Sequence, residues 1–262
     1  MSKYAIVIGI DHYVPPEKSG LKTLKGAIAD AKEVHKWLIS YGGVPEDNCF
    51  LYTSTEQPLA PAKTVIDKKI VDIIKDIQEN HQSDADRLYF YYAGHGLCVP
   101  DDMENTGMCM ADWEEYMADV CSISSSQYKK KFINEGLFKE IILWMDCCRT
   151  AKFQFDPGRG PRILPRMGPN HNPRWMVAFG AQFNNEAFEA VVDPANNEMR
   201  GVFTKVLLEG LTGAAPSAGV RPNVAELSNY LYYKVPLEAQ KAGFSQDPEI
   251  FGNTHTGKPV YF

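Results

Sequence analysis

The chain has 262 residues with 33 acidic and 27 basic side chains, so its formal net charge is −6. A content of 44% hydrophobic and 23% charged residues is typical of a folded globular protein. The acidic balance argues against a nucleic-acid-binding protein, which would present a basic face. No apolar run approaches the roughly 20 residues of a membrane span, and the first residues lack a signal-peptide cleavage site. We therefore expect a cytoplasmic protein without nucleic-acid or membrane partners.

Apolar runs of strand length alternate along the chain with stretches of helical period, which predicts βαβ units and a mainly parallel sheet. The predicted strands cover residues 4–10, 49–52, 88–92, 140–145 and 175–180. The predicted helices cover residues 28–38, 63–80, about 125–134 and 202–211. A further helix starts at a capping box of Asn223 and Glu226 and is ended or kinked by Pro236. A final extended stretch covers residues 248–262.

Two segments have an unusual composition. Residues 97–128 contain seven acidic residues and no Lys or Arg, which favours a solvated loop with a short hairpin over a cation site. In residues 151–174, eight of 24 positions are Pro or Gly, which predicts a long extended loop. The net charge of this loop is +4, which leaves −10 on the other 238 residues. The sequence therefore combines a basic loop with an otherwise acidic protein.

The six cysteines contain no C-x-x-C pair, so we expect reduced thiols rather than disulfides or a structural zinc site. An alternative zinc site using His95, Cys98, Cys109 or Cys121 stays open, although the spacing of these residues is irregular. No metal and no cofactor are predicted.

Two of the predicted strands end in reactive residues, His95 in a Gly-His-Gly turn and Cys148 after Asp146 and Cys147. Because the carboxyl ends of parallel strands meet at one edge of a sheet, we expect the imidazole and the thiol to lie close together. A free thiol is only a few per cent ionised at pH 7, so His95 is the natural base for it. The open backbone N–H of Gly96 is a candidate for an oxyanion hole.

Strand alternation separates the two cysteines, because Asp146 and Cys148 share one face while Cys147 lies on the other. Cys148 is therefore the predicted nucleophile, and Cys147 is predicted to pack in the core. A carboxylate beside a thiol raises the thiol pKa. A carboxylate at this position therefore hinders ionisation of the nucleophile, which is a cost unless the carboxylate has another use. The use we expect for Asp146 is to bind a cationic substrate side chain.

These residues carry a resemblance. The run Tyr91-Tyr92-Ala93-Gly94-His95-Gly96, with Asp146-Cys147-Cys148 placing Cys148 53 residues after His95, resembles the motifs of caspase-like cysteine peptidases. The similarity is greatest to the metacaspase and bacterial caspase-homologue branch. Three further segments resemble family elements in the same order along the chain: Leu24-x-Gly26-x-x-x-Asp30-Ala31, Gly201-Val202-Phe203-Thr204 and Gln246-x-Pro248.

The resemblance implies a three-layer α/β caspase–haemoglobinase-like fold, with a mainly parallel six-stranded sheet and helices on both faces. It implies one domain over 1–262, with a large-subunit-like part (1–150), a linker loop (151–174) and a small-subunit-like part (175–262). It also implies a catalytic dyad of His95 and Cys148, an oxyanion hole from the N–H groups of Gly96 and Cys148, and a basic-residue pocket lined by Asp30 and Asp146.

The function implied is a cysteine endopeptidase that cleaves protein substrates after Arg or Lys. The resemblance also implies activation by a protein partner and a role in antiviral defence or cell death. Because the linker loop is basic and follows the nucleophile, we also predict processing sites at Arg159, Arg162 or Arg166. The alternative is a catalytically silent interaction module on the same fold. A nucleotide-binding domain is disfavoured, because no G-x-G-x-x-G or P-loop follows the first strand.

Overall fold

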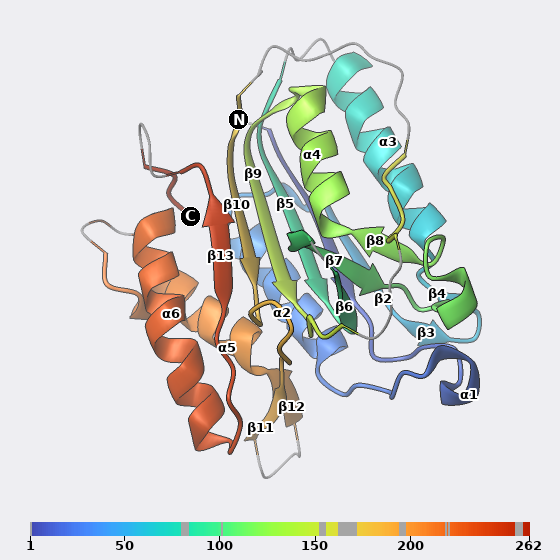
Figure 1. Ribbon diagram of the computed structural model, residues 1–262. Helices are drawn as coiled ribbons and strands as arrows, with labels where there is room; N and C mark the ends of the chain where they lie inside the picture. Colours follow the sequence, from blue (N-terminus) through green and yellow to red (C-terminus); the bar gives the residue numbers. More distant parts are fainter. Residues whose placement is uncertain are drawn as a thin grey trace.

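The computed structural model describes residues 2–79, 84–100, 102–151, 156–161, 172–193, 198–217, 219, 221–254 and 259–262. Its centre is a six-stranded sheet in the order β13-β10-β9-β5-β1-β2, parallel except at β13 (Figure 1). The strands are β1 Lys3–Gly9, β2 Cys49–Thr53, β5 Ala85–Ala93, β9 Phe138–Asp146, β10 Arg174–Phe179 and β13 Glu249–Gly252. The predicted fold class is confirmed.

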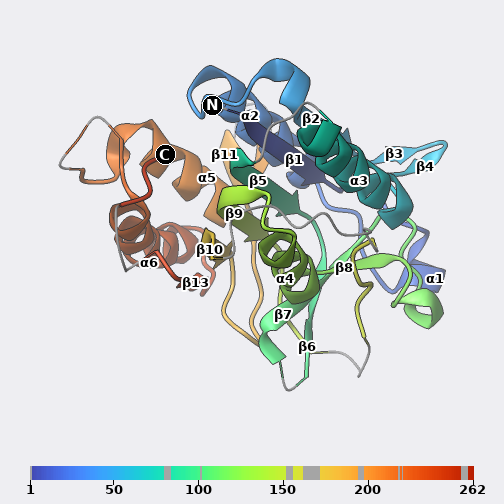
Figure 2. The same ribbon diagram turned by 90° about the horizontal axis from the view of Figure 1, so that it is seen from above.

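Helices cover both faces of the sheet (Figure 1, Figure 2). The isoleucines of α3 (Lys63–Glu79) and the aromatic residues of α4 (Ser125–Glu135) pack into the core on one face. The core on the other face takes side chains from α2 (Ala27–Ser40), α5 (Val202–Glu209) and α6 (Val224–Lys241). The central strands β1, β5 and β9 are thus buried on both sides, which explains their nearly continuous apolar sequences.

The prediction of a short hairpin within residues 97–128 is confirmed, but the prediction that the segment is otherwise a solvated loop is wrong. A small antiparallel sheet of β6 (Gly96–Val99), β7 (Asp102–Cys109) and β8 (Ser122–Ser124) occupies most of this segment. The acidic residues cluster before and after residues 105–111, which are buried. The overall charge of the segment therefore concealed an apolar strand in its middle.

The helix predicted from Asn223 has the expected capping box but does not end at Pro236. α6 continues to Lys241, because Leu231, Val235 and Ala239 are fully buried on both sides of the proline. This packing offsets the backbone hydrogen bond that a proline inside a helix removes.

Several short elements lie outside the predicted set. One is a hairpin of β11 (Glu189–Asp193) and β12 (Glu198–Gly201), at the lower end of the molecule in Figure 1. The others are α1 Pro16–Ser19, η1 Glu46–Asn48, β3 Thr55–Glu56, β4 Leu59–Ala60, η2 Glu115–Met117 and η3 Gly210–Ala214. Most of them span two to five residues, too short for periodicity to show.

The described part of the linker loop, residues 156–161, has no regular secondary structure but is anchored to β8. Gly158 accepts a hydrogen bond from Ser124 N at 3.0 Å and donates one to Ser122 Oγ at 3.3 Å. Arg159 beside it is exposed. The other two predicted processing sites, Arg162 and Arg166, lie outside the described residues.

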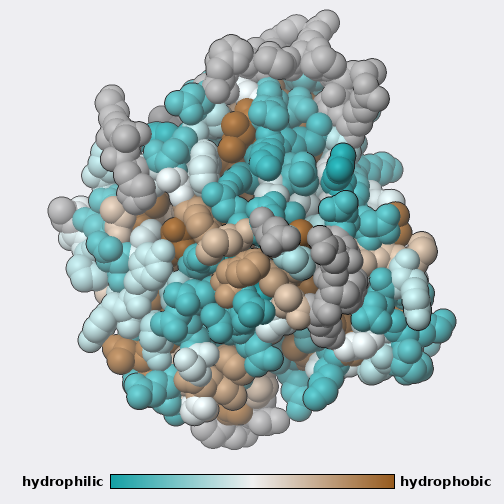
Figure 3. All heavy atoms as spheres, viewed as in Figure 1, coloured by the Kyte–Doolittle hydropathy of each residue, from teal (hydrophilic) through white to brown (hydrophobic). Residues whose placement is uncertain are grey.

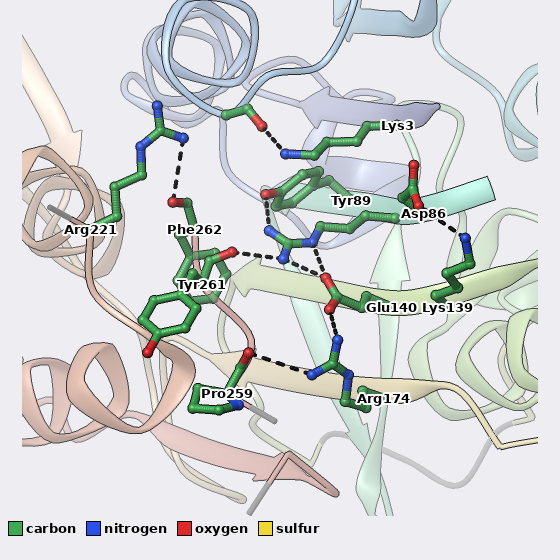
Figure 4. A network of polar contacts seen from close by, with 12 residues as sticks. Lys3, Asp86, Tyr89, Lys139, Glu140, Arg174, Arg221, Pro259, Tyr261 and Phe262 are labelled. Atoms are coloured by element: carbon green, nitrogen blue, oxygen red, sulfur yellow. Dashed lines mark hydrogen bonds and ion pairs between the residues drawn. The ribbon is translucent and has the colours of Figure 1, made fainter. Parts of the chain in front are cut away.

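A row of charges joins the strands at their amino ends (Figure 4). Glu140 on β9 pairs in register with Arg87 on β5 and Arg174 on β10, and its carboxylate forms ion pairs with both. Arg87 also donates to the carbonyl of Tyr261 at 2.7 Å. This network fastens the closing segment of the chain to the sheet, at the end opposite the carboxyl ends of the parallel strands.

The exposed edge of the sheet at β13 is capped by a side chain from α6. The Tyr232 hydroxyl accepts a hydrogen bond from Ile250 N at 3.0 Å and donates to Ile250 O at 3.4 Å.

Hydrophilic side chains cover much of the face seen in Figure 3. Within the described residues, no helix combines the length and the apolar character that crossing a membrane requires.

Candidate active site

His95 follows β5 in a turn whose backbone is held by two tyrosines. His95 N donates to the Tyr13 hydroxyl at 2.7 Å, and the Tyr92 hydroxyl donates to His95 O at 2.7 Å. A Cβ on Gly94 would lie 2.6 Å from each of these hydroxyl oxygens. The turn therefore needs glycine at position 94 so that both tyrosines can hold the histidine backbone.

The imidazole of His95 is oriented by a backbone carbonyl. Nε2 lies 2.7 Å from the carbonyl oxygen of Lys22, and the ring packs against Tyr13 with 5.0 Å between centroids. Because a carbonyl oxygen can only accept, Nε2 carries the hydrogen of this bond. In the neutral ring, Nδ1 is then the nitrogen that can take up a proton.

Cys148 follows β9, and its sulfur lies 3.4 Å from the backbone N of Ala187. Burial raises the pKa of the Cys148 thiol, as do the negative charges of Glu186 and Asp146, while the Ala187 N–H opposes this effect. The resting thiol is therefore protonated at neutral pH and needs a base. Cys147 is buried in the core, as strand alternation predicts.

The structure brings His95 and Cys148 to one cavity of about 240 Å³. Asp30 and Asp146, the predicted substrate-binding acids, line the same cavity. Gly96 lies directly against the nucleophile segment, because a Cβ at this glycine would be 2.6 Å from Cys148 O. All the residues predicted for the dyad, the oxyanion hole and the basic-residue pocket thus meet at the carboxyl end of the sheet.

The two aspartates are fixed by hydrogen bonds to the segment that starts α5. Asp146 accepts from both the N–H and the hydroxyl of Thr204, at 3.0 and 2.7 Å, in the first turn of the helix. A helix amino terminus favours a negative charge there. Asp30, in the first turn of α2, accepts from Gly201 N at 2.7 Å. Gly201 lies between the carboxylates, since a Cβ on it would overlap Asp146 Oδ2 and lie 2.8 Å from Asp30 Oδ2.

Both carboxylates are buried, which weakens their acidity. Burial raises the pKa of Asp146 to about 6. Burial and the nearby Asp146 raise the pKa of Asp30 to about 8, against the lowering effect of Arg200. A cationic group entering the cavity would favour the ionised forms, so the site is electrostatically suited to a basic ligand.

The sequence-based prediction missed several residues of this site. Glu186 and Glu189 also line the cavity, and Glu189 accepts hydrogen bonds from the N–H groups of Lys25 and Gly26. The charge of the surrounding segment could have pointed to these two residues, because residues 181–199 contain four acidic and no basic residues. Nothing in the sequence pattern pointed to Tyr13 or to the carbonyl of Lys22 as partners of the histidine.

The alternative zinc site is wrong. Among the described residues, no group of three or more His, Cys, Asp or Glu side chains is arranged to hold a metal ion. His95, Cys98, Cys109 and Cys121 are all described, and they do not form such a set.

Changing Gly201 to alanine is expected to lower the free energy of unfolding by about 1–3 kcal/mol, because the new methyl group overlaps a buried carboxylate. Urea denaturation measures this. Gly219→Ala is the matched control, since its Cβ would meet only one backbone atom, at 4.0 Å. Equal stability of the two variants would show that the carboxylates are not held against Gly201.

One known protein family matches nearly the whole chain. The profile of the peptidase C14 family, described as a caspase domain, matches residues 2–259. The chain belongs to this caspase family. A probable protease of a Desulfuromonadales bacterium is 28% identical over 223 residues, which are 81% of this chain and 26% of that protein. Metacaspase-1A of Aspergillus oryzae is 31% identical over 102 residues, 38% of this chain and 22% of that protein. The chain thus matches about a quarter of the length of these curated relatives.

Solved structures show the same fold. Caspase-1 of Spodoptera frugiperda superposes on this chain with a TM-score of 0.54 at 18% sequence identity. The match covers 95% of this chain and 86% of the Spodoptera chain. A protein of Geobacter sulfurreducens gives 0.55 at 13% identity, covering 96% and 93%. At these identities the two structures establish the fold alone.

Proposed function

We propose that the chain is a cysteine endopeptidase that cleaves protein substrates after arginine or lysine. The observation that carries this proposal is one cavity whose lining includes the Cys148 thiol, an imidazole and four carboxylates, those of Asp30, Asp146, Glu186 and Glu189. A substrate side chain that ends in a cation would be attracted to the acids. Its scissile carbonyl would then lie near Cys148.

In the proposed reaction, His95 Nδ1 takes the proton of the Cys148 thiol, and the thiolate attacks the carbonyl carbon of the scissile bond. The tetrahedral intermediate collapses to a thioester, and the imidazolium gives its proton to the leaving amine. Water, activated by the neutral imidazole, hydrolyses the thioester and restores the thiol. The hydrogen bond from Nε2 to Lys22 O keeps the ring oriented through both steps.

The oxyanion hole is proposed to consist of the backbone N–H groups of Gly96 and Cys148. The close approach of Gly96 to the nucleophile segment supports this pairing. Each donor aimed at a developing oxyanion typically contributes about 10²–10³ to kcat. A side chain at position 96 would push the two segments apart.

The test is a set of fluorogenic peptides that differ only at the residue before the scissile bond, with Arg, Lys, Asp or Leu. We expect cleavage of the Arg and Lys peptides at least about 100-fold faster than the other two, because only these place a cation among the acids. A preference for Asp would contradict the pocket assignment. A failure to cleave any peptide would favour the catalytically silent interaction module.

Three finer expectations stay predictions. Self-processing is proposed at Arg159, which is exposed beside the anchored Gly158, and at Arg162 and Arg166. Activation by a protein partner and a role in antiviral defence or cell death rest on the resemblance alone.

A further inference from the structure

Arg200 on β12 makes an ion pair with Asp30 that bears directly on the specificity pocket. Its Nε donates to Asp30 Oδ1 at 2.5 Å, while the N–H of the next residue, Gly201, binds Oδ2. Asp30 is buried and Arg200 is largely buried, with 2% and 13% of their side-chain surface exposed. Asp30 comes from α2 and Arg200 from the β11–β12 hairpin, so this pair joins two parts of the chain that are 170 residues apart.

The two partners of this ion pair face different cavities. Asp30 lines the active-site cavity, whereas Arg200 lines two neighbouring cavities of about 420 and 210 Å³. The guanidinium therefore contacts the carboxylate without filling the space in which a substrate side chain would lie. Because a carboxylate oxygen can accept more than one hydrogen bond, Asp30 can bind a second cation from the cavity side.

The ion pair between Arg200 and Asp30 supplies positive charge beside a cavity lined by acids. The described residues that line the cavity include four carboxylates and no Lys or Arg. Burying carboxylates together without a cation is costly, and the usual response is that they take up protons and become neutral. Within the described part of the chain, Arg200 forms an ion pair with one of these four carboxylates, that of Asp30.

We propose that Arg200 is a positioning residue: it favours the charged form of Asp30 and orients the carboxylate toward the cavity, and thereby sets the preference for a cationic over a neutral side chain before the scissile bond. This inference rests on the proposed function. It names a residue outside the cavity on which the selectivity of the enzyme for basic substrates depends.

The charges around Asp30 give the expected pH dependence. Asp146 on β9 raises the pKa of Asp30, and Arg200 on β12 lowers it. Tyr91 on β5 and Glu189 on β11 also face this pair of aspartates. A neighbouring Arg lowers the pKa of a carboxyl by about 1–3. As pH rises through the pKa of Asp30 the carboxylate gains its charge, so preference for a cation rises with pH. Without Arg200 this rise moves to higher pH.

The experiment compares an arginyl peptide with a citrullinyl peptide, which has the same shape and no charge. The ratio of their kcat/KM values cancels the ionisation of Cys148 and His95, because both substrates use the same dyad. In the wild type the ratio is expected to increase between about pH 6 and pH 9. In Arg200→Met it falls by about tenfold or more at pH 7, and the increase moves to higher pH. Arg200→Lys keeps the cation and restores most of the ratio.

Lys205→Met is the matched control, since Lys205 lines the same two outer cavities and forms ion pairs with Glu209 and Glu238 rather than with Asp30. Its ratio should equal that of the wild type. If Arg200→Met does not fold, the double variant Asp30→Asn/Arg200→Met removes both charges of the buried pair. This variant is expected to lose the preference for the arginyl peptide.

An unchanged ratio and pH profile in Arg200→Met, or a wild-type ratio in the double variant, would overturn the role of Arg200 and leave the proposed function intact. A wild-type enzyme that cleaves neither the arginyl nor the lysyl peptide would instead overturn the proposed function, and this inference with it.

Discussion

Replacing Cys148 by alanine is expected to reduce kcat/KM toward an arginyl peptide by about 10⁴-fold or more. Among the described residues, the other thiol that lines the cavity is that of Cys147, which is 2% exposed and packs in the core. Steady-state kinetics with the fluorogenic arginyl peptide measures this loss. Thermal unfolding of the variant should stay close to that of the wild type, since the Cys148 side chain is only partly buried.

The neighbouring Cys147 is the matched control for this change. Its sulfur packs in the core, so Cys147→Ala is expected to keep kcat/KM within about tenfold and to lower stability by about 1 kcal/mol. If activity survives in Cys148→Ala and disappears in Cys147→Ala, the assignment of the nucleophile from strand alternation is wrong.

Replacing Arg149 by methionine is expected to cost about 2–3 kcal/mol of unfolding free energy, because it removes the hydrogen bonds of a fully buried guanidinium and leaves the partly buried Glu249 without its cation. Arg149 is 0% exposed and forms an ion pair with Glu249 on β13. It also donates to Thr106 Oγ1 at 3.0 Å, and its guanidinium lies 3.9 Å from the centre of the Phe179 ring. One side chain thus ties the residue after the nucleophile to β7, β10 and β13.

Urea denaturation of Arg149→Met measures this effect. The exposed Arg159, ten residues further along the chain, gives the matched control Arg159→Met, which should change stability by no more than about 0.5 kcal/mol. Adding Glu249→Gln to Arg149→Met should recover part of the loss, because the unpaired carboxylate is then gone. Equal stability of the two single variants would show that the buried pair does not support the fold.

The sequence predicted the sheet and the position of His95 and Cys148 at one edge of it, and the reasons are local. Continuous apolar runs indicated β1, β5 and β9, and the isoleucine spacing indicated α3. His95 and Cys148 could be found because each directly follows such a run. Asp30 was different, because only the family resemblance pointed to it.

The residues that the sequence did not reveal act through contacts across long separations. Arg200 reaches Asp30 over 170 positions, and Glu189 binds Gly26 over 163. Nothing in the sequence indicated that Arg149 is buried, since burial of a charged side chain is unusual and depends on partners from distant strands. Periodicity and spacing describe neighbours along the chain, and they carry no information about such pairs.

The hydrogen bonds of the Tyr232 hydroxyl to both backbone groups of Ile250 affect how copies of this molecule can meet. A free strand edge offers unpaired N–H and C=O groups to any other extended chain, and such edges promote aggregation. At β13 both groups of Ile250 are already engaged. A strand from a second molecule would have to break both bonds before it could join the sheet there. The aromatic ring thus makes this margin of the sheet a poor template for strand addition.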